Sequence, residues 1–173
     1  MLKKLFQDTA IYGIATVLPR VMTLLLTRLY VSKLDTNDFG IYSGIFVYLI
    51  LGNVLLSYGM ETAFFRFMNK GEQKKQVQST ALTSLTVSSL FFLLVAYLLR
   101  ESIALWLNYK VEHIVFGIYI MVLDALVVIP FAWLRNKGKA NFYAFVKVGN
   151  TALNLLLNIY FLNYLSQESI ATN

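Results

Sequence analysis

The sequence contains no cysteine, two prolines and a single histidine in 173 residues. The absence of cysteine excludes disulfide bonds and metal sites built on thiolates. Charged residues are also scarce, at 14% against the roughly 25% that is usual in soluble domains. Hydrophobic residues reach 58% instead, and the mean hydropathy is +0.62. This is the composition of a membrane protein, for which we expect no bound metal or other cofactor.

Five segments are long and apolar enough to cross a bilayer, which takes roughly 20 mostly apolar residues. They are residues 9–32, 40–60, 79–99, 113–134 and 142–164. The first segment follows two early lysines, as the core of a signal peptide does, but it is too long and no small-residue cleavage site follows it. The sequence therefore predicts an all-α integral membrane protein, a single bundle of about five helices over residues 1–173, with the first helix retained.

The distribution of lysine and arginine predicts the orientation of these helices, because cytoplasmic loops carry the excess of basic residues. With the amino terminus inside, nine basic residues fall in inner segments and three in outer loops. The inner nine are Lys3, Lys4, Arg66, Lys70, Lys74, Lys75, Arg135, Lys137 and Lys139, and the outer three are Lys33, Arg100 and Lys110. We therefore expect a cytoplasmic amino terminus and an outer carboxyl terminus. The net charge of +6 then fits an anionic membrane surface, and no nucleic-acid partner is expected.

Segment 9–32 carries Arg20 near its middle. An arginine at the bilayer centre costs about 2.5–3.5 kcal/mol on insertion scales, so it needs polar surroundings. At 100° per residue, Arg20 shares an arc of roughly 80° with small and hydroxylated residues, a set that we name the first seam. Besides Arg20, the first seam contains Thr9, Gly13, Thr16, Thr23 and Thr27. A seam of this kind explains how a membrane helix tolerates Arg20.

Segment 142–164 repeats the pattern, and its polar residues also fall within about 80° of arc. This second seam contains Lys147, Asn150, Asn154 and Asn158. One interpretation is hydrogen bonding between helices, the usual role of asparagine in membrane helices. The other is the lining of a polar cavity, because a lysine adds little to simple packing. The residues alone leave both interpretations open.

Asp124 is the one acidic residue inside segment 113–134. Counted from the inner surface, Asp124 and Arg20 both lie about 16 Å deep at 1.5 Å per residue, and Lys147 lies several ångströms lower. Asp124 is therefore a candidate ion-pair partner of Arg20. Alternatively, it is a titrating group that couples transport to protons or sodium. His113 begins this segment at the outer interface, and we interpret it as a surface residue rather than a proton relay.

Three stretches resemble a known family of membrane proteins. They are DFGIYSGIFVYL at 38–49, SYGMETAFFRF at 57–67 and IPFAWLRNKGKANFYAFVKVGNTALNLLLN at 129–158. They are similar to the opening of the second helix, a helix end, and the fourth-to-fifth helix passage of polysaccharide exporters and O-antigen flippases. The first helix, with its Pro19–Arg20 pair, fits as well. These proteins belong to the multidrug/oligosaccharidyl-lipid/polysaccharide flippase superfamily, and the resemblance touches most of the chain.

The resemblance implies that the chain is the amino-terminal part of a two-lobed flippase, with the second lobe absent. Such flippases move lipid-linked oligosaccharide precursors of polysaccharide or lipopolysaccharide across the cytoplasmic (inner) membrane by alternating access. The resemblance also implies a cationic cavity that holds the diphosphate of a polyprenyl-linked sugar. Its candidate residues here are Arg20, Lys147, Asn150 and Asn154, with Arg66 at the inner mouth. A polysaccharide polymerase and glycosyltransferases are the protein partners to expect.

Three other functions compete with this one. A multidrug or cation exchanger of the same superfamily would use acidic residues in its cavity, and Asp124 is the one available. A small accessory membrane protein would have no transport activity of its own. A membrane enzyme would need clustered acidic residues to hold a metal, whereas Asp124 and Glu61 are expected at different depths. We therefore expect that the chain is not an enzyme.

Overall fold

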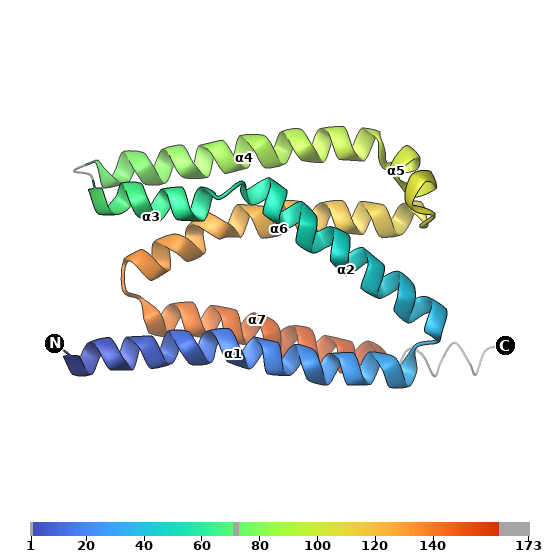
Figure 1. Ribbon diagram of the computed structural model, residues 1–173, viewed down its shortest axis with the longest axis horizontal. Helices are drawn as coiled ribbons and strands as arrows, with labels where there is room; N and C mark the ends of the chain where they lie inside the picture. The colour runs from blue at the N-terminus through green and yellow to red at the C-terminus, as the bar shows by residue number, and fades with distance from the viewer. Residues whose placement is uncertain (1, 71–72, 163–173) are drawn as a thin grey trace. The chain divides into compact units, whose positions relative to one another are not determined.

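The computed structural model describes residues 2–70 and 73–162, which form helices and no strand (Figure 1). The helices are α1 (Leu2–Lys33), α2 (Thr36–Ser57), α3 (Met60–Lys70), α4 (Lys74–Leu98), α5 (Arg100–Leu107), α6 (Val111–Asn136) and α7 (Ala140–Tyr160). The predicted all-α fold is therefore confirmed for the described residues.

Four helical stretches within the described ranges are long and apolar enough to cross a membrane. They are Thr9–Lys33, Thr36–Asn69, Lys74–Leu98 and Val111–Asn136. They overlap the first four predicted segments, and the chain is a multi-pass membrane protein. Helix α7 does not belong to this set, because Lys147 and several asparagines lower its hydropathy. The crossing by 142–164, whose residues 163 and 164 lie outside the described ranges, stays a prediction, as does the orientation of the helices.

The chain divides into two compact units. Unit 1 contains Met1–Phe39 and Gly138–Asn173, and unit 2 contains Gly40–Lys137. In unit 1, α1 and α7 lie side by side and run in the same direction (Figure 1). Two contacts fix this direction, because an earlier residue of α1 meets an earlier residue of α7 and a later residue meets a later one. The first contact joins Tyr12 to Tyr143, and the second joins Tyr30 to Asn158.

The core of unit 2 is formed by α3, α4 and α6. Helix α3 is amphipathic, since Met60, Phe64 and Met68 recur every four residues on one face while Arg66 and Phe67 remain exposed. The buried cluster contains Phe64 and Met68 of α3, Ala81 and Leu85 of α4, and Ile129 and Ala132 of α6. Packing against this cluster, rather than hydropathy alone, keeps the short α3 in place.

A break at Tyr58–Gly59 separates α2 from α3. Both residues have positive φ, 32° for Tyr58 and 71° for Gly59. A left-handed conformation ends a helix, and glycine adopts it without a steric penalty. The Tyr58 hydroxyl lies 2.8 Å from Ser84 Oγ, which ties the break to α4. The helices on either side of this region reach beyond the predicted segments. Helix α3 continues to Lys70, past the end of segment 40–60, and α4 begins at Lys74, before the start of segment 79–99.

Candidate functional site

The contacts between α1 and α7 fix the relative height of the two predicted seams. The residue numbers differ by 131 for Tyr12 and Tyr143, and by 128 for Tyr30 and Asn158. Arg20 therefore lies level with residues 148–151, and Lys147 lies about 1.5–6 Å nearer the start of the helices at 1.5 Å per residue. This agrees with the relative heights expected from the sequence. The two cations are at most about one helical turn apart along the helix axis.

The hydroxyl groups of Thr16, Thr23 and Thr27 in the first seam are satisfied within α1 itself. Thr16 Oγ1 donates to the Tyr12 carbonyl at 2.8 Å, and Thr23 Oγ1 donates to the Pro19 carbonyl at 2.9 Å. Thr27 Oγ1 makes the same bond to Thr23. These local bonds let threonine face an apolar medium without a second helix. Arg20 is exposed like these threonines, but it has no hydrogen bond or ion pair among the described residues.

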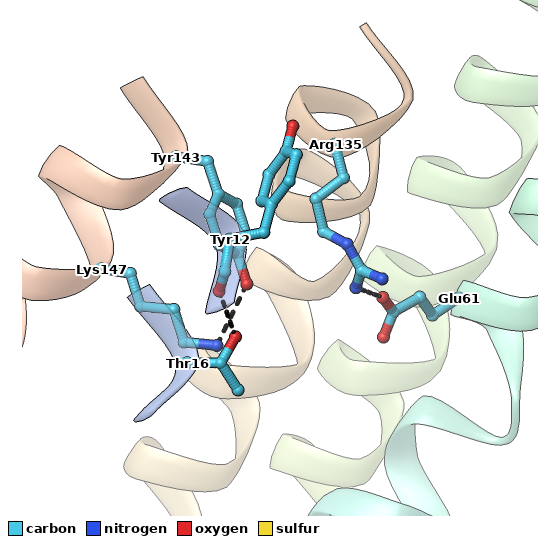
Figure 2. A network of polar contacts seen from close by, with 6 residues as sticks. All are labelled: Tyr12, Thr16, Glu61, Arg135, Tyr143 and Lys147. Carbon is cyan, nitrogen blue, oxygen red and sulfur yellow. Dashed lines mark hydrogen bonds and ion pairs between the residues drawn. The ribbon is translucent and has the colours of Figure 1, made fainter. Parts of the chain in front are cut away.

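Lys147 is half-buried and held by an aromatic side chain one turn earlier in α7. Its ammonium donates to the Tyr143 hydroxyl at 3.1 Å and lies 5.4 Å from the centroid of the same ring (Figure 2). Tyr143 is buried and packs edge-on against Tyr12, with ring centroids 5.3 Å apart. An ammonium has three donors, and Tyr143 accepts from one of them. The chain thus positions Lys147 without neutralising its charge.

The asparagines of α7 differ in their contacts, and one of them shows the hydrogen bonding between helices that the sequence suggested, whereas the lining of a polar cavity stays a prediction. Asn158 Oδ1 accepts a hydrogen bond from the Tyr30 hydroxyl at 2.6 Å, which is a bond between helices. Asn158 Nδ2 donates to Asn154 Oδ1 at 2.9 Å, so these two amides are linked. Asn150 is exposed, and its amide has no partner in the described part of the chain. Asn158 therefore stabilises the helix pair, whereas Asn150 and one side of Asn154 remain available to a ligand.

The first seam and Asn150 of the second seam lie on the same side of the α1–α7 pair. Viewed from the start of both helices, the first seam lies about 60° clockwise of the direction in which Tyr12 and Tyr30 face α7. Asn150 lies about 50° anticlockwise of the mean direction of Tyr143 and Asn158, which face α1. On two parallel helices that face each other, a clockwise displacement on the first and an anticlockwise displacement on the second point to the same side of the pair. Lys147 and Asn154 lie within about 10° of the direction that faces α1, so they border this side from the interface between the two helices. We name the set of Thr16, Arg20, Thr23, Asn150, Lys147 and Asn154 the unit 1 polar face.

The remaining candidates, Asp124 and Arg66, belong to unit 2. Asp124 is exposed and accepts a hydrogen bond from Asn53 Nδ2 of α2 at 2.9 Å. Arg20 belongs to unit 1, and its pairing with Asp124 stays a prediction. Arg66 is exposed on α3 and has no partner among the described residues.

Sequence reasoning missed several partners. Glu61 pairs with Arg135 (Figure 2). Arg135 also lies 5.1 Å from the Phe65 ring centroid. Tyr143 could have been predicted as the partner of Lys147 from its i−4 spacing. Asn53 could not, because its contact with Asp124 depends on how α2 and α6 are rotated. Within the described ranges, no group of three or more His, Cys, Asp or Glu side chains could hold a metal ion.

Comparison of the chain with protein-family models, with curated proteins and with solved structures finds no match.

Proposed function

We propose that the chain is part of a flippase that moves a polyprenyl-diphosphate-linked oligosaccharide across the cytoplasmic (inner) membrane by alternating access. In this proposal it supplies the amino-terminal helices, and a second lobe completes the cavity. The transported lipid is a precursor of polysaccharide or lipopolysaccharide, made by glycosyltransferases and consumed by a polymerase. The chain binds and moves this substrate and performs no covalent chemistry on it.

The observation that carries the proposal is the charge of the unit 1 polar face. Arg20 and Lys147 lie within about one turn of each other in height, and neither has a carboxylate partner in the described residues. Residues 9–33 and 140–160 contain no acidic residue. Two uncompensated cations in a membrane protein favour an anionic ligand, because charge-assisted hydrogen bonds are strongest where water is scarce.

The diphosphate of the substrate supplies the missing negative charge. Arg20 offers a planar fork of donors that matches a phosphate with two parallel hydrogen bonds. Lys147 offers the donors that Tyr143 does not use, and the amides of Asn150 and Asn154 provide neutral donors beside them. The resemblance of segments 38–49, 57–67 and 129–158 to polysaccharide exporters supports the same class of substrate.

A cation exchanger of the same superfamily is the second candidate, and it rests on Asp124. Its carboxylate is exposed, lies in a membrane-crossing helix and accepts a single hydrogen bond from Asn53 within the described residues. An acidic residue in that environment is typical of a cation or proton site. Its charge is opposite to that of the unit 1 polar face, so substrate charge separates the two functions.

The proposal is tested in the complete transporter by measuring the movement of the native lipid-linked substrate. Arg20→Ala should abolish transport, and Arg20→Lys should retain part of it because lysine keeps the charge but loses the two-pronged geometry. If Arg20 served only to pair with Asp124, the double change Arg20→Ala and Asp124→Asn would restore both expression and transport. We expect the double variant to recover expression without transport. Wild-type transport by the double variant would overturn the role of Arg20 in substrate binding.

A further inference from the structure

Helix α5 connects two membrane-crossing helices of unit 2, α4 and α6, and carries large apolar side chains that the described chain leaves uncovered (Figure 1). Leu105 is 84% exposed and Trp106 is 83% exposed, more than any other large apolar side chain of the described residues. Leu98 and Leu99, just before α5, are at least half exposed. Apolar surface of this kind marks a contact with a membrane or with another protein. The depth of α5 and its two sides distinguish these partners.

The composition of α4 puts its end at one boundary of the hydrocarbon core. Residues 74–80 contain two lysines and two glutamines, whereas residues 81–99 contain no charged residue. At about 1.5 Å per residue, the uncharged stretch is about 28 Å long, close to the roughly 30 Å thickness of the core. The core therefore ends near Leu99, and α5 begins outside it. Tyr97, just inside this boundary, has its ring centroid 4.5 Å from the Arg100 guanidinium, and both residue types favour the membrane interface.

Helix α6 gives the same boundary independently. Its last turn contains Arg135, which belongs outside the core at the opposite end of the helix. Counting roughly 20 residues back from Leu134 reaches Val115, where the core begins on the side of α5. The interface between core and water is only about 5–7 Å thick on each side. Because α5 contacts both α4 and α6, it lies in this interface.

The inward side of α5 packs on the apolar interior of unit 2. Ala104 is buried, and Ile103 and Leu107 are half-buried and line an apolar cavity of about 380 Å³ between α2, α4, α5 and α6. His113 lines the same cavity and is half-buried, whereas the sequence predicted a surface residue. These contacts determine which side of α5 is directed away from unit 2.

The outward side of α5 changes from polar to apolar along the helix. Glu101 and Ser102 of the first turn share this side with Leu105 and Trp106 of the second turn, and all four are exposed. Glu101 forms an ion pair with Arg100 at 3.4 Å. A protein that covered this side would take the charge of Glu101 out of water, which is unfavourable. A membrane interface accommodates both turns, because tryptophan has an apolar ring and one N–H donor.

We propose that α5 is an anchor in the membrane interface, with Leu105 and Trp106 inserted among the phospholipids at the headgroup end of their acyl chains. Glu101 and Ser102 remain on the water side. Because α5 contacts both α4 and α6, the anchor fixes the height of these two helices in the bilayer. The inference is independent of the unit 1 polar face, of the proposed transport function and of the side of the membrane on which α5 lies.

The test uses the fluorescence of Trp106 in the full chain in nanodiscs. The chain has two tryptophans, so Trp133→Phe leaves Trp106 alone. Phospholipids brominated at the headgroup end of their chains should quench Trp106 more than phospholipids brominated at the tail end, and iodide in the water should quench it weakly. The control is Lys75→Trp in a chain that also carries Trp106→Phe and Trp133→Phe. It lies about 9 Å outside the uncharged stretch of α4, so iodide should quench it and neither lipid should.

Two results would overturn the proposal. Iodide quenching of Trp106 as strong as that of the Lys75→Trp control would show that the side chain lies in water. Resistance of Trp106 to both lipids and to iodide would show that a second copy of the chain or another protein covers it.

A second pair of variants tests the polar-to-apolar change along α5 and keeps both tryptophans. The chain has no cysteine, so spin labels can be attached at Leu105→Cys and at Ser102→Cys, which are exposed on the same side of the same helix. The label at Leu105→Cys should collide more with oxygen, which is enriched in lipid, and the label at Ser102→Cys more with a water-soluble nickel complex. Equal accessibility at the two positions, or the opposite order, would contradict the insertion of the second turn.

Discussion

Single residues show three ways of keeping a charge in this membrane protein. Lys147 rests on Tyr143, which orients the ammonium without neutralising it. Glu61 and Arg135 neutralise each other. Arg20 has neither arrangement among the described residues, and it is the residue that most needs a partner from outside the chain. The differences between these residues can be measured one substitution at a time.

The Glu61–Arg135 pair should contribute little to stability by its charges. Both side chains are more than 40% exposed, and exposed pairs contribute about 0.2–1 kcal/mol. Glu61→Gln should therefore lower the free energy of unfolding by less than about 1 kcal/mol. Arg135→Ala should lower it further, because it also removes the contact with the Phe65 ring. Denaturant unfolding in detergent measures both, with Arg66→Ala as a neutral control. A larger loss for Glu61→Gln than for Arg135→Ala would contradict this account.

At the scale of the helix, two glycines with equally open surroundings should change the stability in opposite directions when each is replaced by alanine. A Cβ would meet nothing within 4 Å at either Gly59 or Gly149. Gly59 has φ of 71° between α2 and α3, so Gly59→Ala should destabilise the fold by about 1 kcal/mol or more. Gly149 lies inside α7, where alanine should stabilise by up to about 1 kcal/mol. Thermal unfolding of the two variants measures the signs; equal shifts would refute the role assigned to the break at Tyr58–Gly59.

The α1–α7 pair should be held in register by the hydrogen bond from Tyr30 to Asn158. A double-mutant cycle with Tyr30→Phe and Asn158→Leu should give a coupling energy of about 0.6–1.7 kcal/mol, the range for hydrogen bonds between membrane helices. Unfolding of the four proteins in detergent provides the measurement. Additive effects of the two changes would mean that the register has another origin.

Hydropathy predicted the helices that cross the membrane better than it predicted their ends. Four predicted segments overlap long apolar helices of the structure, because long apolar runs leave the backbone no alternative to a helix in lipid. The amphipathic α3 was missed, since its core face depends on contacts with α4 and α6 that no local pattern records. The first turn of α4 is also too polar for lipid, yet its lysines and glutamines are good helix formers.

The sequence predicted which residues of the candidate site share a helix face, but it did not predict which residues they contact. A period of 100° per residue grouped Arg20 with its threonines, and Lys147 with its asparagines, and the structure places all of them in helices. Which face of α1 meets α7 depends on Tyr12 and Tyr30, whose partners lie far along the chain. The contacts Asn53–Asp124 and Glu61–Arg135 also join residues far apart in the sequence, so only the structure reveals them.

For the whole molecule, the prediction to test first is the orientation in the membrane. Reporter fusions at Lys74 and Lys137 should give cytoplasmic signals, and fusions at Asp35 and Asn108 should give outer signals, because nine of the twelve loop and terminal cations then lie inside. Even if α7 does not cross the membrane, Lys74 and Lys137 should lie on the same side. An outer signal at Lys137 would refute the arrangement of the first four crossings.

Accessibility to water is a second whole-molecule property. The chain has no cysteine, so single cysteines can be introduced directly into the transporter. Cysteines at Thr16, Thr23 and Asn154 on the unit 1 polar face should react with water-soluble thiol reagents. Cysteines at Leu24 and Leu156, which lie outside the two seams, should react much less. Similar labelling at all five positions would mean that no polar cavity exists beside these helices.

The central claim is that the unit 1 polar face binds the diphosphate of a lipid-linked substrate. The direct test is the affinity of the chain in nanodiscs for a polyprenyl diphosphate, compared with the uncharged polyprenol of the same length. Each charge-assisted hydrogen bond contributes about 1.5–3 kcal/mol, so wild type should bind the diphosphate at least about tenfold more tightly. The double variant Arg20→Gln and Lys147→Gln should lose this preference while still binding the polyprenol. Equal affinity of wild type for the two lipids, or a preference that the double variant retains, would contradict the claim.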